Sequence, residues 1–220
     1  MRTEPKTWKA IVFDFDGTLA RLNIDFAMMR AAVRDLPLCR AIPEERLKNL
    51  MTLEMIEAAG AFIAERNKKD ASRFLKEAYG IVTEIEMEAA EEGELFSCTR
   101  MLLAELKRRA VKTGIVTRNC RTAVLRIFPD IELYADATLT REDSRNVKPH
   151  PDHLQNAFGI LRTPGEKAAM IGDHPMDIIA ARKAGSCAVG VLTGSADEKG
   201  LLDAGADMVL ANASEILGLI

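Results

Sequence analysis

The chain has 220 residues, of which 48% are hydrophobic and 29% charged, and its formal net charge is −3. This composition predicts a globular protein with a sizeable core, and the lack of a basic tract argues against a nucleic-acid-binding protein. No apolar stretch reaches the roughly 20 residues of a membrane-spanning helix, so we expect no membrane partner. Neither a signal peptide nor a C-x-x-C pair is found, which favours a cytoplasmic location. We expect a monomer or a homodimer without a nucleic-acid partner.

The first predicted element is a buried strand near the N-terminus that ends in two carboxylates. Residues 10–13 carry no polar side chain, which is typical of a strand covered on both faces of a parallel sheet. Asp14 and Asp16 follow on one side of the chain, and Gly17 permits a sharp turn. Adjacent carboxylates repel unless a cation lies between them or one holds a proton. They indicate a magnesium site or acid–base chemistry, although Asp-x-Asp-Gly also occurs in ordinary turns.

Between residues 22 and 93 the sequence predicts helices and no strand. Apolar side chains recur there at helical spacing, as in Phe26, Met29, Val33 and Leu36 and again between residues 47 and 56. We predict helix breaks at Gly60 and at residues 66–70, and a helix end at Gly80. This pattern predicts an all-helical insertion at residues 21–92 between the two parts of a core domain, residues 1–20 and 93–220. The alternative is a single layered domain that includes these helices.

From residue 99 onward, predicted helices and strands alternate. Helices are predicted at residues 99–109, 121–128, 151–158, 175–184 and 197–204 and at the C-terminus, and strands at residues 111–117, 168–171, 187–192 and 208–210. Such alternation is typical of a parallel α/β sheet. The predicted fold class is therefore α/β, with a Rossmann-like parallel sheet core flanked by helices.

Polar residues follow the second predicted strand, where an α/β sheet binds its ligands. Thr117 ends that strand, and Asn119 can cap the next helix. A hydroxyl beside the free N–H groups of a helix N-terminus can hold a phosphate. Ordinary helix capping explains the same two residues.

Lys148 lies in a segment restricted by two prolines, Pro149 and Pro151. A lysine held in a rigid turn could supply a fixed positive charge to a phosphoryl group during its transfer. The alternative for any single lysine is a solvated position in a loop.

Two further carboxylates lie at the end of the strand predicted at residues 168–171. Asp173 follows it directly, and Asp177 lies four residues later at the start of a helix, so both can face one point. Oxygen ligands of this kind suit Mg²⁺. The alternative is that Asp173 caps the helix and Asp177 is an acid of its first turn. That alternative explains each residue separately, but it does not explain why successive strand ends carry residues suited to binding metal and phosphate.

Together these segments resemble the four sequence motifs of the haloacid-dehalogenase superfamily of phosphohydrolases. The motifs are represented by Asp14-Phe15-Asp16-Gly17-Thr18, by Thr117, by Lys148-Pro149-His150-Pro151, and by Gly172-Asp173 with Asp177. Residues 180–185 and 190–194 are similar to the phosphoglycolate-phosphatase-like branch of that superfamily. The helical insertion after the first motif resembles its cap domain.

The resemblance implies a Mg²⁺-dependent phosphatase that hydrolyses a small cytosolic phosphomonoester through an aspartyl-phosphate. Asp14 would be the nucleophile, Asp16 the general acid and base, and Lys148 the residue that balances charge. The metal site would comprise Asp14, Asp16, Asp173 and Asp177, with Asp16 acting through its backbone carbonyl, and the phosphate site would comprise Thr117, Arg118, Asn119 and Lys148.

Three alternative functions remain at this point. A phosphosugar mutase would pass the phosphoryl group from the aspartate to its substrate instead of to water. A phosphonate-cleaving enzyme would need a lysine in the insertion, where the candidates are Lys48, Lys68, Lys69 and Lys76. A non-catalytic phosphate-binding protein would retain the phosphate pocket but catalyse no reaction. Asp16 favours phosphate-ester hydrolysis over dehalogenation, because the dehalogenases of the superfamily have no acid at that position.

Overall fold

The computed structural model describes residues 8–220 and divides the chain into two units. One unit contains the residues up to Leu22 together with Ala90–Ile220, and the other is Asn23–Ala89. Among the described helices, none is both long enough and apolar enough to cross a lipid bilayer.

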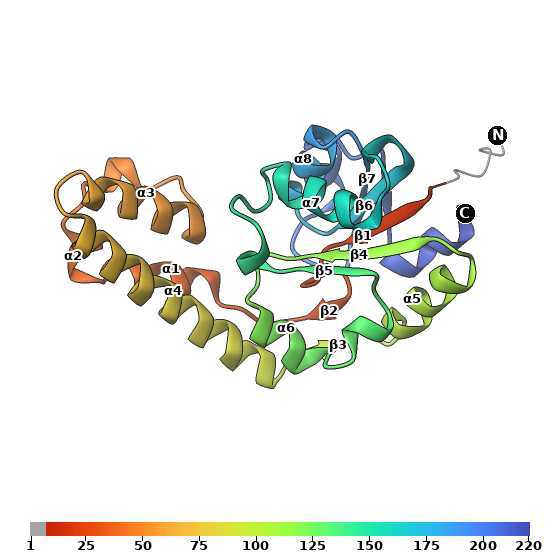
Figure 1. The fold of residues 1–220 in the computed structure, drawn as a ribbon, viewed down its shortest axis with the longest axis horizontal. Helices are drawn as coiled ribbons and strands as arrows, with labels where there is room; N and C mark the ends of the chain where they lie inside the picture. Colours follow the sequence, from red (N-terminus) through yellow and green to blue (C-terminus); the bar gives the residue numbers. More distant parts are fainter. Residues whose placement is uncertain (1–7) are drawn as a thin grey trace. The chain divides into compact units, whose positions relative to one another are not determined.

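A six-stranded sheet lies at the centre of the first unit, with all neighbouring strands parallel (Figure 1). Its order is β5-β4-β1-β6-β7-β8, so the prediction of a parallel α/β sheet is confirmed. The strands are β1 (Ala10–Phe13), β4 (Lys112–Val116), β5 (Ala137–Leu139), β6 (Ala168–Gly172), β7 (Cys187–Val191) and β8 (Met208–Leu210).

Strand β1 lies between β4 and β6, and Val12 is paired with Gly114 on one side and Met170 on the other. The chain therefore builds the sheet outward from β1 in both directions. At such a switch point the loops that follow neighbouring strands diverge and leave a crevice at the carboxyl ends of the strands. The apolar run of β1 is fully buried, as expected for a strand covered on both faces.

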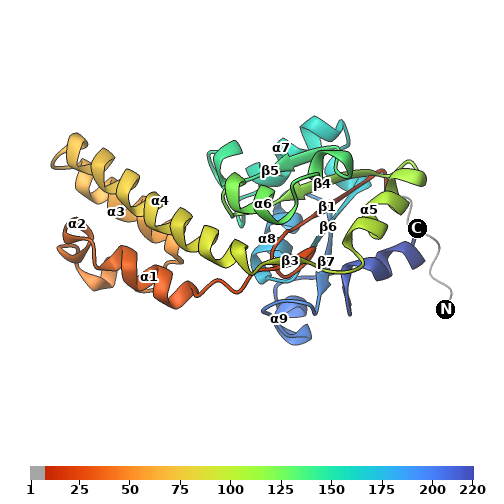
Figure 2. The ribbon, with the colours of Figure 1, turned by 90° about the horizontal axis from the view of Figure 1, so that it is seen from below.

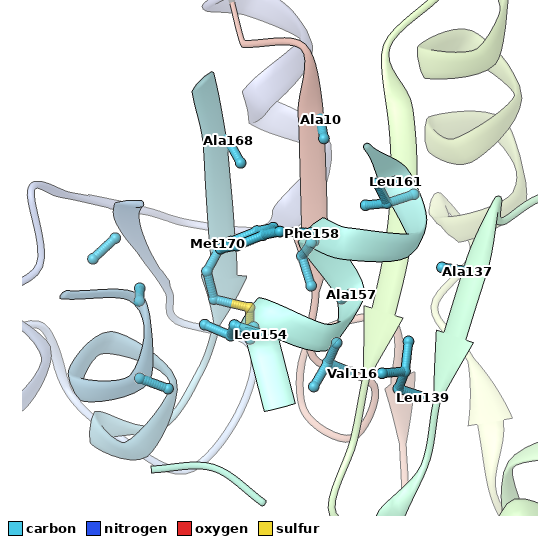
Figure 3. Packing of buried hydrophobic residues seen from close by; sticks show 14 of the residues in the cluster. Ala10, Val116, Ala137, Leu139, Leu154, Ala157, Phe158, Leu161, Ala168 and Met170 are labelled. Atoms are coloured by element: carbon cyan, nitrogen blue, oxygen red, sulfur yellow. The ribbon is translucent and has the colours of Figure 1, made fainter. Parts of the chain in front are cut away.

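Helices cover both faces of this sheet. On one face, Met170 of β6 packs against Leu154 and Phe158 of α7 (Figure 3). Ala180 and Leu201, from the next two helices, are buried in the same cluster. The helices of this face are α7 (Asp152–Leu161), α8 (Pro175–Lys183) and α9 (Glu198–Asp203).

The side chain of Phe13 points to the other face, because it alternates with Val12 along β1. Helix α5 (Thr99–Arg108) contacts β4, and its Leu102 and Leu106 are fully buried. The remaining elements of this unit are α6 (Arg121–Ile127), a short antiparallel pair of β2 (Ala20–Arg21) with β3 (Glu94–Leu95), and the 3-10 helices η2 (Ile131–Leu133), η3 (Arg141–Asp143), η4 (Gly165–Lys167) and η5 (Ala213–Gly218).

The second unit is helical, and no strand lies within its residues 23–89, as predicted. Helices α3 and α4 run side by side (Figure 2), and a Cβ at Gly60 would lie 2.7 Å from the Leu75 side chain. Gly60 therefore permits a close approach of the two helices. The elements are α1 (Phe26–Arg34), α2 (Pro37–Arg40), η1 (Glu44–Arg46), α3 (Thr52–Ala64) and α4 (Lys68–Glu91).

Several predicted boundaries were wrong. Helix α4 continues through Gly80, because Phe74, Ala78 and Val82 form a buried helical stripe that continues past the glycine. Helix α3 likewise continues through Gly60. The three residues of β5 escaped prediction because they are too few to show a periodic pattern. The final element, η5, is a 3-10 helix.

Candidate active site

The predicted site residues come from loops at the carboxyl-end edge of the sheet. Asp14 follows β1 and Asp173 follows β6, and the two parallel strands are paired directly. Thr117 follows β4 and still belongs to the ladder, since its N–H donates to the Leu139 carbonyl of β5 at 2.9 Å. Parallel strands end at one edge of the sheet, so residues far apart in the sequence meet there.

Three carboxylates converge at this edge. Asp14, Asp173 and Asp177 each offer an oxygen, and the three oxygens lie within 4.8 Å of one another. Asp173 is 5% exposed and Asp177 1% exposed. Asp14 is partly exposed. Such a small set of carboxylate oxygens fits a hard divalent cation such as Mg²⁺, which takes one or two carboxylates together with water and phosphate oxygens.

Lys148 reaches the same point from the loop before α7. Its Nζ lies 2.7 Å from Asp14 Oδ1 and 2.7 Å from Asp177 Oδ1. The side chain is 1% exposed, so the alternative of a solvated loop lysine was wrong. Lys148 links the carboxylate that follows β1 to the first turn of α8.

The charge of this cluster is not balanced. Burial and the neighbouring Asp177 raise the pKa of Asp14 to about 6, against the lowering effect of Lys148. Burial also raises the pKa of Asp177, with Asp173 adding to the effect. Burial alone would lower the pKa of Lys148, but Asp14 and Asp177 raise it above its ordinary value. One ammonium thus accompanies three carboxylates, two of them buried. A divalent cation would supply the missing positive charge.

The carboxyl group of Asp16 lies outside the group of three. Its Oδ1 accepts a hydrogen bond from the Leu22 N–H at 2.9 Å. Burial raises the pKa of Asp16 to about 7, and the charges of Asp14 and Asp173 raise it further against the Leu22 bond. A carboxyl group with a pKa near neutrality can both give and accept a proton at physiological pH.

Asp177 is also a helix-capping residue. Its Oδ2 accepts the His174 N–H at 3.1 Å and completes a capping box at the start of α8. Gly172 makes room for it, because a Cβ there would lie 2.3 Å from Asp177 Oδ2. The N-cap of α8 is His174, so the capping interpretation of Asp173 was wrong. Asp177 lies in the first turn of α8, so its interpretation as a first-turn acid is confirmed.

The loop after β4 supplies the remaining predicted residues. The hydroxyl of Thr117 accepts the Asn119 N–H at 3.1 Å, and both side chains are buried. Arg118 donates to the Lys148 carbonyl at 2.5 Å and approaches Met176 Sδ at 3.0 Å, so it ties this loop to the lysine loop and to α8. The N-cap of α6 is Cys120, and the prediction that Asn119 caps this helix was wrong.

The side-chain amide of Asn119 is buried instead. Its Nδ2 has no hydrogen-bond partner among the described residues. A buried donor without a partner costs about 1–3 kcal/mol, and an oxygen of a bound ligand would satisfy it.

Sequence reasoning missed the residues that hold Asp173. The Ser195 N–H donates to Asp173 Oδ2 at 2.9 Å, and the Thr18 hydroxyl to Oδ1 at 3.3 Å. Ser195 lies in the loop after β7. Inspecting polar residues after every predicted strand, this one included, would have found it.

The chain is similar to known proteins in sequence and in fold. The family model described as haloacid dehalogenase-like hydrolase matches residues 11–191. Pyrophosphatase PpaX of Bacillus cereus is 40% identical over 85 residues, which are 37% of this chain and 39% of that protein. The chain therefore matches about two fifths of the length of such curated relatives.

Solved structures share the fold at low sequence identity. A hydrolase from Pseudomonas syringae has a TM-score of 0.69 and 23% identity, with 96% of each chain covered. The β-phosphoglucomutase of Clostridium difficile has a TM-score of 0.65 and 19% identity, with 94% of this chain and 92% of that chain covered. At these identities the likeness concerns the fold alone.

Proposed function

We propose that this chain, which belongs to the haloacid dehalogenase-like hydrolase family, is a Mg²⁺-dependent phosphatase that hydrolyses a small phosphomonoester through an aspartyl-phosphate. The observation that supports this most is the buried contact of Lys148 with both Asp14 and Asp177, beside the carboxylate of Asp173. Structural roles rarely gather so many buried charges, because each charge removed from water costs free energy that only close partners return.

The cation would be held by Asp14 and Asp173 together with the backbone carbonyl of Asp16, and Asp177 would lie nearby. When bound, Mg²⁺ supplies positive charge that lets the carboxylates crowd together and reduces the repulsion between the nucleophile and the substrate phosphate.

Asp14 is the nucleophile in this proposal. Its carboxylate attacks phosphorus in line, so that a bond from its oxygen to phosphorus forms while the bond from phosphorus to the leaving oxygen breaks. Asp14 Oδ1 already accepts bonds from the Phe15 N–H and from Lys148, both at 2.7 Å. These contacts orient the carboxylate before substrate arrives.

Asp16 moves the protons. With a pKa near 7, it donates a proton to the leaving oxygen in the first step. It then takes a proton from the water that attacks the aspartyl-phosphate. The second step releases inorganic phosphate and regenerates the Asp14 carboxylate.

The phosphate is bound by Thr117, Arg118, Asn119 and Lys148. The unpartnered Nδ2 of Asn119 is the donor that we assign to a phosphate oxygen, since a bound phosphate would satisfy it. Lys148 balances the charge that spreads over the phosphate oxygens during transfer. Arg118 keeps this lysine in place through its bond to the Lys148 carbonyl.

A panel of phosphate compounds tests the proposal. It includes phosphoglycolate, sugar phosphates and nucleotides, and also pyrophosphate because the matched relative is named a pyrophosphatase. We expect at least one to release inorganic phosphate in the presence of Mg²⁺. EDTA should lower that rate on the order of 100-fold or more, and added Mg²⁺ should restore it.

The other outcomes identify the alternatives. Formation of an isomer without net phosphate release would indicate a phosphosugar mutase. Tight binding of a phosphate ester without turnover of any compound would indicate a binding protein. Turnover that EDTA leaves unchanged would contradict the metal-dependent mechanism.

A further inference from the structure

Residues 193–195, which follow β7, connect two parts of the candidate site. The Thr193 hydroxyl donates to the Gly17 carbonyl at 2.6 Å. The Ser195 N–H donates to Asp173 Oδ2 at 2.9 Å, and the Ser195 hydroxyl lies 3.3 Å from the same oxygen. One short segment thus contacts both the turn after Asp16 and the carboxylate after β6.

The carboxylate of Asp173 is held on both of its oxygens. The Ser195 N–H donates a hydrogen bond to Oδ2, and the buried hydroxyl of Thr18 donates one to Oδ1 at 3.3 Å. These bonds orient the carboxylate.

Gly194 lies directly against the same carboxylate. A Cβ at this position would be 2.0 Å from Asp173 Oδ2, and a Cβ at Gly17 would be 2.6 Å from it. Such distances are far below any real contact, so a side chain at either position would displace the carboxylate or the loop. The segment is therefore packed against Asp173 without space between them.

We propose that residues 193–195 position the metal site: Thr193 fixes the Asp16–Gly17 turn, while Gly194 and Ser195 fix the carboxylate of Asp173. This inference rests on the proposed function, since it assigns the segment to the cation of that reaction. Thr193 and Ser195 are positioning residues, because they act through Gly17 and Asp173 and contact neither substrate nor cation themselves.

The size of the effect follows from how metal sites respond to changes in the groups around their ligands. Loss of an outer partner that orients a ligand typically costs about 10–100-fold in metal affinity or activity. The Thr193 hydroxyl makes a short bond to a carbonyl one residue from a proposed metal ligand. Its loss should therefore lower the affinity for Mg²⁺ and leave the overall fold in place.

Two variants and two matched controls test the proposal. Thr193→Val removes the hydroxyl, and Gly194→Ala introduces the methyl group that clashes with Asp173. Thr163→Val removes a buried threonine hydroxyl that donates to the Leu161 carbonyl at 3.2 Å, away from the site. Gly159→Ala adds a methyl group where nothing lies within 4 Å.

Calorimetric titration of each substrate-free protein with Mg²⁺ gives the readout, with Tm measured in parallel. We expect Thr193→Val and Gly194→Ala to weaken Mg²⁺ binding by about 10-fold or more. Thr193→Ser keeps the hydroxyl and should bind Mg²⁺ as the wild type does. Thr163→Val and Gly159→Ala should also bind Mg²⁺ as the wild type does. The Mg²⁺ concentration needed for half-maximal turnover should shift in the same way.

The possible failures can be told apart. If the wild type binds Mg²⁺ and Thr193→Val binds it equally well, the positioning role is overturned and the proposed function stands. The same holds if Thr163→Val weakens binding as much as Thr193→Val, since a general loss of stability would then explain both. If the wild type binds no divalent cation, the proposed function fails and this inference fails with it.

Discussion

Asp14→Asn lowers kcat for phosphate release by on the order of 10⁴-fold or more, the scale seen when a nucleophile is removed from other enzymes. The reason is chemical, because a neutral amide does not attack phosphorus at neutral pH. The change conserves the shape of the side chain. It also keeps an oxygen in position to accept from the Phe15 N–H and from Lys148, so circular dichroism and Tm should show a folded protein. The substrate identified in the panel provides the assay.

Asp136→Asn is the matched control. Asp136 also lies in the sheet unit, where its Oδ2 accepts the Thr113 N–H at 2.8 Å outside the candidate site. We expect this variant to keep wild-type kcat. If Asp14→Asn kept a tenth or more of wild-type activity while remaining folded, Asp14 would not be the nucleophile.

Lys148→Met has the second large effect, and it acts on activity and stability together. Removal of one member of a buried ion pair typically costs about 3–5 kcal/mol, because the partner charge is left without compensation. Here the buried carboxylate of Asp177 and the partly buried carboxylate of Asp14 lose their ammonium. We also expect kcat to fall on the order of 100- to 1,000-fold, as when one stabilising donor is removed from a transition state.

The stability loss of Lys148→Met should grow with pH. Without the ammonium, the pKa values of Asp14 and Asp177 rise further above their unfolded values, so the folded state binds more protons than the unfolded state. Folding stability then falls as pH rises from about 4 through those raised values. Lys148 itself, whose pKa is raised, stays charged over this range in the wild type. Urea unfolding in EDTA at pH 5 and pH 8 measures the difference.

Two further variants test whether the stability loss of Lys148→Met comes from the uncompensated carboxylates. Lys199→Met removes an exposed ammonium that pairs with Asp203 at 2.6 Å, and it should change stability little at either pH. Adding Asp177→Asn to Lys148→Met removes one of the uncompensated carboxylates, so part of the stability at pH 8 should return. If Lys148→Met lost the same stability at pH 5 and pH 8, the loss would not come from the uncompensated charges of Asp14 and Asp177.

The strands that carry the site could be predicted because their sequences are unambiguous. The apolar run of β1 and the polar residues directly after it identify a buried strand with Asp14 at its end. The same pattern identifies β6 with Asp173. Because parallel strands end at one edge, their convergence followed from fold class alone, and the structure brings one oxygen of each within 4.8 Å of the other.

Other features depend on packing that no local pattern encodes. Lysine side chains are usually solvated, so the burial of Lys148 became visible only in the structure. Gly80 breaks the local preference for a helix, yet the buried stripe of α4 continues through it. The contacts of residues 193–195 with Gly17 and Asp173 link separate segments of the chain, and single-sequence periodicity carries no signal for such pairs.

A crystal structure with Mg²⁺ and orthovanadate bound tests the central claim most directly. The account predicts one cation held by carboxylate oxygens of Asp14 and Asp173 and by the Asp16 carbonyl. The vanadate should lie beside Asp14 within hydrogen-bond distance of the Thr117 hydroxyl. A cation bound elsewhere, or a vanadate remote from Asp14, would contradict it.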